Sequence, residues 1–263
     1  MTERHQQAAV LGASEQGGTG WAIAQALAAR GFFVTVGARR RSGIEQLAAE
    51  IGGRALTCDA TIEEDVARFC AAAGEDGGLD CAVLVAGAGV QGMIDDIPLD
   101  ILAGCMKLNF DAPFHFVRHA ARVMNDNGSI VLMSSIAATN PWSGYVAYGC
   151  AKSAVQTLVR YAALEYGPRG IRINAVCPGP ISTPAAGHLL DHPRAGAIVA
   201  AEVPLGRCAR PEEVAEAVAW LGTSPGWITG ETIHTDGGMS LRRPPHVADI
   251  RAAMASNELN FEA

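Results

Sequence analysis

A tyrosine and a lysine four residues apart, Tyr148 and Lys152, are the first pair in the sequence whose spacing indicates chemistry. Residues at this spacing lie on one face of a helix. A free tyrosine has a pKa near 10, and we expect the lysine ammonium to lower it toward neutral pH. Ser135 lies thirteen residues upstream, at the end of an expected strand, where its hydroxyl can hold a substrate oxygen. The three side chains predict general acid/base catalysis at that oxygen.

A glycine-rich turn lies between the first expected strand and the first expected helix. Glycines allow a tight turn and a close approach of the backbone to a pyrophosphate, which the free N–H groups and the positive end of the helix dipole hold. The position of the turn therefore predicts a dinucleotide site. The expected cofactor contacts in this turn are Gly12, Ser14, Gly18, Thr19 and Gly20.

The second expected strand ends in arginines, where a carboxylate would mark NAD. Arg39 and Arg40 favour binding of a 2′-phosphate, since guanidinium groups are bidentate phosphate donors. The cofactor is therefore predicted to be NADP(H), and its cationic oxidised nicotinamide would also lower the pKa of Tyr148. The alternative is a solvated basic turn that opens the next helix. Asp59, just past the third strand, is expected to accept a hydrogen bond from the adenine amino group, with Ala60 beside it.

Short apolar strands alternate with longer helices along the chain. The expected strands are 8–12, 32–37, 54–58, 81–85, 129–133, 171–176 and 231–234, and the expected helices are 21–30, 44–51, 62–73, 99–124 with a bend near Pro113, 148–166 and 212–221. Wholly apolar strands that alternate with helices predict an α/β fold with a doubly wound parallel sheet, covered on both faces. We expect one domain over residues 1–240. The tail, 241–263, includes a helix near 247–255 and is expected to be disordered or docked on a neighbouring subunit.

Composition excludes several classes of function. The net charge of −7 argues against binding of nucleic acid. Seven cysteines without a C-x-x-C pair indicate a reducing compartment, and we expect a cytoplasmic protein. No apolar stretch approaches the roughly 20 residues that span a bilayer, so no membrane association is expected. His188 and His192 lack a third well-spaced ligand, so no metal site is expected. His115 and His119 are expected to be partly exposed or at an interface.

Taken together, these motifs make the chain resemble the single-domain short-chain dehydrogenase/reductases, with a Rossmann-like fold, from about Ala8 to Met239. The motifs are the glycine turn, Cys58-Asp59, Leu108-Asn109-Phe110, Met133-Ser134-Ser135, the Tyr148/Lys152 pair, the segment 174–180 and Asp236-Gly237-Gly238. The resemblance implies hydride transfer between nicotinamide and a ketone, an aldehyde or a secondary alcohol.

The resemblance also implies a role for each matching residue. Asn109 would hold a water in the proton relay, Ser135 would orient the carbonyl, Tyr148 would give or take the proton, and Lys152 would bind the nicotinamide ribose. Further cofactor contacts are expected from Ala86, Gly87, Ala88, Pro178, Gly179, Ile181 and Thr183, the last to the carboxamide. Residues 185–203 would form a lid over the substrate, and the assembly would be a homotetramer or a homodimer.

Three departures from the family pattern stand out. Five residues rather than three separate Gly12 from Gly18, which leaves open whether Ser14, Glu15 or Gln16 faces the cofactor. The frequent Asn-Asn-Ala-Gly after the fourth strand is replaced by 86–89, Ala-Gly-Ala-Gly, so another group must brace that backbone. The basic residue often found inside the glycine turn is missing, which leaves the 2′-phosphate to Arg39 and Arg40.

The sequence identifies a small-molecule substrate only by class. Trp142, Tyr145 and His188 are candidates for the substrate pocket. A 3-oxoacyl group on an acidic carrier protein is the alternative substrate, although the loop 124–127 supplies no cations and leaves only Arg169 and Arg172. The same scaffold would also suit a non-catalytic NADPH-binding module, an epimerase or a dehydratase.

Overall fold

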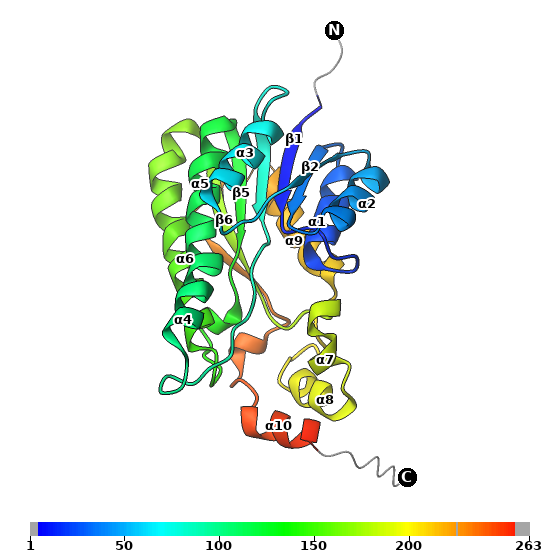
Figure 1. Ribbon diagram of the computed structural model, residues 1–263, viewed down its shortest axis with the longest axis vertical. Helices are drawn as coiled ribbons and strands as arrows, with labels where there is room; N and C mark the ends of the chain where they lie inside the picture. The colour runs from blue at the N-terminus through cyan, green and yellow to red at the C-terminus, as the bar shows by residue number, and fades with distance from the viewer. Residues whose placement is uncertain (1–4, 225, 256–263) are drawn as a thin grey trace.

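Seven parallel strands form one sheet in the computed structural model, which describes residues 5–224 and 226–255 (Figure 1). The strands are β1 (Gln7–Leu11), β2 (Phe33–Ala38), β3 (Arg54–Thr57), β4 (Leu79–Leu84), β5 (Met124–Met133), β6 (Arg172–Pro178) and β7 (Thr232–Thr235). Their order is β3-β2-β1-β4-β5-β6-β7. Because β1 pairs with both β2 and β4, the strand order reverses there, and ligands of such sheets bind at the carboxyl ends beside this point. The predicted fold class is confirmed.

Helices cover both faces of the sheet, as the wholly apolar strands require. One face carries α3 (Glu63–Ala73), α5 (Ala112–Val123) and α6 (Val146–Tyr166), and the other carries α1 (Thr19–Ala28), α2 (Arg41–Ile51) and α9 (Pro211–Thr223). Each layer closes over its own buried cluster, in which Phe116 and Leu27 are fully buried. No helix among the described residues combines the length and apolar character needed to cross a bilayer.

The predicted helix 99–124 is two helices joined by a π-helical segment. α4 (Leu99–Met106) leads into a π-helical turn over Lys107–Asp111, and α5 then begins at Ala112 with Pro113 in its first turn. The irregularity therefore precedes Pro113, where a bend was expected, because a proline in the first helical turn costs no hydrogen bond. Single π-turns of this kind often occur at functional sites.

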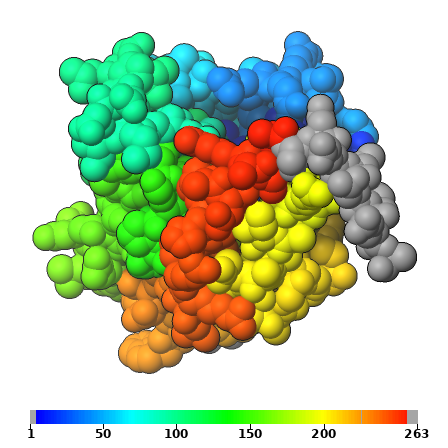
Figure 2. Space-filling view, turned by 90° about the horizontal axis from the view of Figure 1, so that it is seen from below, coloured from blue at the N-terminus to red at the C-terminus, as the bar shows by residue number. Residues whose placement is uncertain are grey.

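The segments after β6 and β7 form a layer below the carboxyl ends of the strands. After β6 come a 3₁₀ turn (Pro184–Ala186), α7 (Gly187–Leu190) and α8 (Pro193–Ala201). After β7 comes α10 (Val247–Ala255), the helix predicted near these residues, which packs on α8 of its own chain (Figure 2). The part of the tail that the structure describes thus lies on the expected lid.

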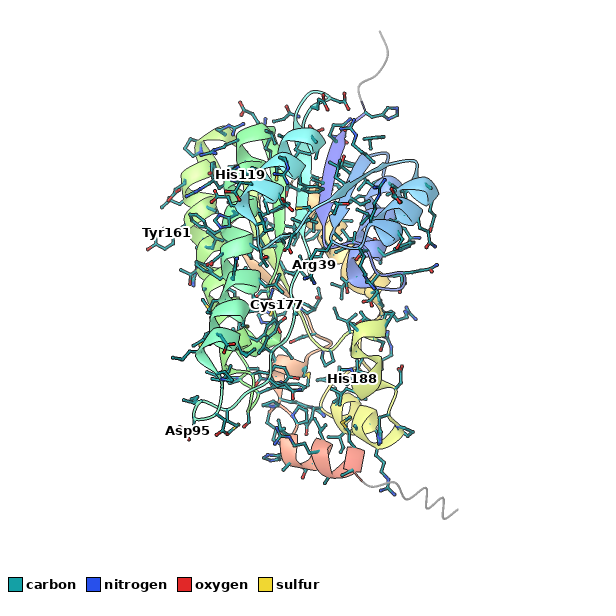
Figure 3. All side chains as sticks on the ribbon, in the orientation of Figure 1. Arg39, Asp95, His119, Tyr161, Cys177 and His188 are labelled. Carbon is teal, nitrogen blue, oxygen red and sulfur yellow. The ribbon has the colours of Figure 1, made fainter. Side chains whose placement is uncertain are left out.

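The two histidines expected to be partly exposed or at an interface connect α5 to the start of α3. His119 Nε2 lies 3.0 Å from Glu63 Oε1, and His115 Nδ1 lies 3.5 Å from Glu63 Oε2 (Figure 3). Arg118 donates to the same carboxylate at 3.1 Å. The hydrogen bond with His119 contributes most to lowering the pKa of Glu63. Both histidines are thus partly exposed, as expected, and they face α3.

Candidate active site

Two neighbouring cavities open at the carboxyl ends of the strands. The first, of about 450 Å³, lies over the ends of β1 to β4. It is lined by Leu11, Gly12, Ser14, Glu15, Ala38, Arg39, Arg40, Cys58, Asp59, Ala60, Ala86, Gly87, Ala88 and Leu108. The second, of about 290 Å³, lies beyond the ends of β5 and β6 and includes Ser135 and Tyr148. The structure thereby brings the expected cofactor residues of the first four strands into one cavity.

The glycine turn packs too closely for side chains at two of its positions. Gly12 has a φ of +107°, and a Cβ there would lie 2.4 Å from the backbone nitrogen of Ala86. A Cβ on Gly20 would lie 2.2 Å from the carbonyl oxygen of Gly12. Gly18 donates to the carbonyl of Glu15 at 2.9 Å and precedes α1, whose first turn carries no acidic residue. No acidic residue of α1 itself therefore neutralises the positive end of this helix.

The longer turn places Ser14 and Glu15, but not Gln16, among the residues lining the first cavity. Both contact Arg40: its Nε donates to Ser14 Oγ at 3.2 Å, and its Nη2 lies 3.8 Å from Glu15 Oε1. Gly18 and Thr19 lie at the start of α1 rather than in the cavity wall. Ser14 and Glu15 thus connect the turn to Arg40, just after β2.

Arg39 lines this cavity, and its guanidinium is available to bind a ligand (Figure 3). Its exposed guanidinium makes no hydrogen bond or ion pair within the described residues. Asp59, in the same cavity, accepts hydrogen bonds from the backbone nitrogen and the hydroxyl of Thr61 at 2.9 and 2.8 Å. Although burial opposes the charged form, these bonds and the charge of Arg39 lower the pKa of Asp59. A free cation and a charged carboxylate therefore face one nucleotide-sized cavity.

Ser135, Tyr148 and Lys152 meet where β5 and the first turns of α6 adjoin. Ser135 follows β5, and its Oγ accepts from the backbone nitrogen of Ala137 at 3.2 Å. Lys152 is buried, with Nζ 2.9 Å from the carbonyl oxygen of Met133 and 5.5 Å from the centre of the Tyr148 ring. The predicted trio is thus assembled from two adjacent elements.

In the protein without a bound cofactor, burial is the largest influence on the pKa of Tyr148. It raises the pKa of Tyr148 to about 12, although a hydrogen bond with Ser135 acts in the opposite direction. Burial also lowers the pKa of Lys152 to about 8. In the chain without a cofactor, burial therefore outweighs any lowering of the Tyr148 pKa by Lys152, whose ammonium donates to the Met133 carbonyl.

Asn109 is fully buried in the π-helical turn and braces the loop after β4. Its Nδ2 donates to the carbonyl oxygens of Ala88 and Cys105, each at 3.0 Å, and its Oδ1 accepts from the nitrogen of Ala88 at 3.2 Å. This amide supplies the brace that the Ala-Gly-Ala-Gly loop lacks. A Cβ on Gly87 would lie 3.0 Å from Asn109 Oδ1 and 3.1 Å from Lys152 Nζ, so Gly87, which lines the first cavity, packs against both side chains.

The segment after β6 borders the second cavity. Gly179 and Ile181 line it, whereas Pro178 ends β6 and Thr183 Oγ1 accepts from the nitrogen of Ala186 at 3.3 Å. A Cβ on Gly179 would lie 3.0 Å from Asp236 Cα. The carboxylate of Asp236 accepts from the nitrogens of Gly238 and Ser240, each at 2.9 Å. The Asp-Gly-Gly motif therefore packs against Gly179, which lines the second cavity.

Trp142 and Tyr145 line the second cavity, but His188 does not. His188 is exposed, and its Nδ1 lies 3.2 Å from the carbonyl oxygen of Ala185 (Figure 3). α7 instead turns Leu189 and Leu190 inward. The expectation for His188 is wrong because the orientation of this short helix depends on its packing. Sequence reasoning also missed Ile136, Ala137, Pro180 and Val199, apolar lining residues whose types carry no chemical signal.

No group of three potential metal ligands occurs among residues 5–224 and 226–255. His192 Nδ1 instead accepts from the backbone nitrogen of Ala195 at 3.2 Å and caps α8. His192 therefore has a structural role at the start of α8, and its spacing from His188 does not indicate a shared ligand.

Known proteins share both the sequence pattern and this architecture. The family model described as enoyl-(acyl carrier protein) reductase matches residues 12–240. Glucose 1-dehydrogenase of Gluconobacter oxydans is 35% identical over 243 residues, which cover 88% of this chain and 91% of that protein.

Solved structures agree over nearly the whole chain. A short-chain dehydrogenase/reductase from Mycobacterium ulcerans superposes with a TM-score of 0.89 at 30% identity, covering 97% of this chain and 98% of that one. A variant of actinorhodin polyketide ketoreductase with NADPH superposes with a TM-score of 0.85 at 27% identity, covering 91% and 98% of the two chains.

Proposed function

Because this chain belongs to the short-chain dehydrogenase/reductase family, we propose that it is an NADP(H)-dependent oxidoreductase acting on a ketone or aldehyde, or on the corresponding alcohol. The observation that carries the proposal is the convergence of Ser135, Tyr148 and Lys152 at a cavity adjoining the nucleotide-sized one. When bound, the nicotinamide supplies or accepts the hydride. The other steps belong to side chains of this chain.

The proton steps follow from the contacts of the three side chains. The Ser135 hydroxyl donates to the substrate oxygen and holds it beside Tyr148. In reduction, the phenol gives its proton to the oxygen as the hydride reaches the carbon, and in oxidation the phenolate takes the proton back. The raised pKa of Tyr148 keeps the phenol protonated at neutral pH, and a cation beside the phenol would lower this pKa toward the working pH, which favours proton transfer in both directions. Lys152 is held against β5 for the nicotinamide ribose, and Asn109 fixes the loop beside it.

The exposed guanidinium of Arg39, just after β2, supports NADP(H) rather than NAD as the cofactor. Arg39 makes no hydrogen bond or ion pair among the described residues, and no carboxylate occupies the end of β2 to accept ribose hydroxyls. Arg40 already bonds Ser14 and lies near Glu15, so Arg39 is the better 2′-phosphate ligand. Asp59 remains the proposed partner of the adenine amino group.

Titration with NADPH and NADH, followed by nicotinamide fluorescence, tests the cofactor. The protein should bind NADPH at least tenfold more tightly, since charge-assisted phosphate contacts contribute about 1.5–3 kcal/mol. Arg39→Asp should abolish the preference. Arg41→Asp is the matched control, because Arg41 pairs with Glu45 at 2.7 Å and does not line the cavity. Equal affinity for both cofactors in the unmodified protein would contradict the assignment.

The carrier-protein alternative receives little support from the basic residues near β5. Arg169 donates to the carbonyl oxygens of Ala121 and Met124 and pairs with Asp126 at 3.0 Å. Arg172 donates to the carbonyls of Leu221 and Ser224. These guanidiniums stabilise the fold and are not free to bind an acidic carrier. All seven cysteines are free, which agrees with the proposed cytoplasmic location.

Two exposed apolar faces support a homotetramer. α5 and α6 border a groove of about 730 Å³, with Phe114 39%, Tyr161 63% and Leu164 76% exposed. Figure 3 shows Tyr161 directed away from the molecule. On the opposite face of the sheet, Trp220 of α9 is 47% exposed, and Trp227, which follows α9 in the chain, is fully exposed. Two distinct self-complementary faces generate a tetramer, whereas one generates a dimer.

A further inference from the structure

The second cavity is lined mostly by apolar side chains. Its lining residues are Ser135, Ile136, Ala137, Trp142, Tyr145, Tyr148, Gly179, Pro180, Ile181, Ala186, Leu189, Leu190 and Val199, and none of these carries a charge. Of the three hydroxyls, those of Ser135 and Tyr148 belong to the reacting centre. The Tyr145 hydroxyl already bonds Gln91 Nε2 at 2.7 Å. Trp142 adds one neutral donor, its buried indole Nε1, which has no hydrogen-bond partner among the described residues. Away from the reacting oxygen, a substrate would therefore meet few polar partners and no charge.

Basic residues of the tail and the lid do not supply a charge to this cavity. Arg242 donates to the carbonyl oxygen of Ala201 at 2.9 Å, and Arg243 lies 3.6 Å from a carboxylate oxygen of Glu202. His188 is exposed on α7 and does not border the cavity. A carboxylate or phosphate inside this cavity would lose its water without gaining a counter-charge, which is costly.

The cavity is also small. Its volume of about 290 Å³ lies at the lower end of the range of roughly 300–1,000 Å³ that ligand pockets occupy. Gly179 and Ile181 border it as well, so a nicotinamide ring along them would take part of this space. The remainder fits a single ring or a short branched chain.

The C-terminal helix, α10, packs against α8, which contributes Val199 to the wall of the cavity. Val199 lines the cavity and is fully buried in a cluster with Ala195 and Ile250 of α10, against which Trp142 also packs. α10 lies beyond residue 240, where the match to the family model ends. The position of this wall therefore depends on a helix outside the matched region as well as on the lining residues within it.

We propose that the pocket selects a compact, uncharged hydrophobic ketone, or the corresponding secondary alcohol, and discriminates against substrates that carry a carboxylate or several hydroxyls. The inference rests on the proposed function. In the reduction, the hydride and its electron pair pass from NADPH to the carbonyl carbon, the C=O π bond breaks, and the oxygen takes the proton of Tyr148. The products are the alcohol and NADP⁺.

Two ketones of the same ring size test the inference in the unmodified enzyme: 4-methylcyclohexanone and 4-oxocyclohexanecarboxylate, each with NADPH. We expect kcat/KM to be at least about a hundredfold higher for the neutral ketone, because the carboxylate would be buried unpaired. In the other direction, 4-methylcyclohexanol with NADP⁺ should be oxidised more efficiently than D-glucose.

A charge placed in the wall should shift this preference. Leu190→Arg supplies a cation to the cavity and should reduce the ratio of the two kcat/KM values at least tenfold. His188→Arg, which adds the same charge to the exposed side of α7, is the matched control and should leave the ratio unchanged.

The outcomes separate the two proposals. Equal turnover of the two ketones, or a preference for the carboxylate, would overturn the substrate class and leave the oxidoreductase assignment intact. NADPH binding with no turnover of any of the four compounds would overturn both.

Discussion

Lys152 is a charged side chain in the interior of the protein, and its position costs stability. Its side chain is 2% exposed, and the hydrogen bond of Nζ is to a neutral carbonyl, that of Met133. Removal of a charge from water is unfavourable without a counter-charge, so burial lowers the pKa of Lys152 from 10.5 to about 8. A residue retained at such a cost is expected to serve the chemistry rather than the fold.

Lys152→Met tests this cost through its pH dependence. Between about pH 8 and 10.5 the unfolded chain holds the Lys152 proton that the folded protein has released, so wild-type stability rises with pH in this window. The variant lacks this contribution. The free energy of unfolding of the wild type, relative to the variant, should increase by about 1–3 kcal/mol from pH 7 to pH 10.

Urea unfolding of both proteins at the two pH values measures the difference. If the free energy of unfolding of the wild type, relative to that of Lys152→Met, stays constant or falls as the pH rises, the pKa of Lys152 is not lowered in the folded protein.

At the scale of elements, the lid and the C-terminal helix act as one unit. Ile250 is 7% exposed and packs on Ala195 and Val199 of α8, so α10 supports the wall that faces the substrate. Ile250→Asp should raise the KM for 4-methylcyclohexanone roughly tenfold and leave the Kd for NADPH unchanged, because the lid meets the substrate and not the adenosine half of the cofactor.

Met254→Asp is the control, since Met254 is 40% exposed on the same helix. An unchanged KM in Ile250→Asp, or an equal change in both variants, would show that α10 does not position the lid.

The elements also show how far the sequence could be interpreted. The strand and helix pattern predicted the sheet and placed Ser135, Tyr148 and Lys152, because their side-chain types and spacing carry chemistry. The π-helical turn around Asn109 could not be predicted, since Lys107–Asp111 has ordinary helical residues and the turn exists through packing against Ala88 and Cys105.

Similarly, β5 begins at Met124 rather than Ser129, because Met124 pairs with Leu79 across an irregular register. The roles of His115, His119 and His188 depend on which way a helix turns in the folded chain. A lone sequence does not specify that orientation.

At the scale of the whole molecule, the two apolar faces predict the route of assembly. Tyr161→Arg combined with Leu164→Arg should disrupt the contact through α5 and α6 and leave dimers, and Trp220→Arg should do the same through the other face. All three substitutions together should give monomers. Light scattering after gel filtration measures the mass.

Met254→Arg, an exposed change on α10, should leave the tetramer intact. An unmodified chain with the mass of a monomer would refute the assembly.

The most direct test of the account follows the hydride itself. NADPH with both C4 hydrogens replaced by deuterium is incubated with 4-methylcyclohexanone, and the alcohol is analysed by mass spectrometry. We predict one deuterium at the carbinol carbon. Tyr148→Phe should form this product at least about a hundredfold more slowly, with NADPH binding retained. Tyr161→Phe, the same change at an exposed tyrosine of α6 outside the pocket, is the control and should stay near the wild-type rate. Alcohol without deuterium, or a wild-type rate in Tyr148→Phe, would contradict hydride transfer with Tyr148 as the proton donor.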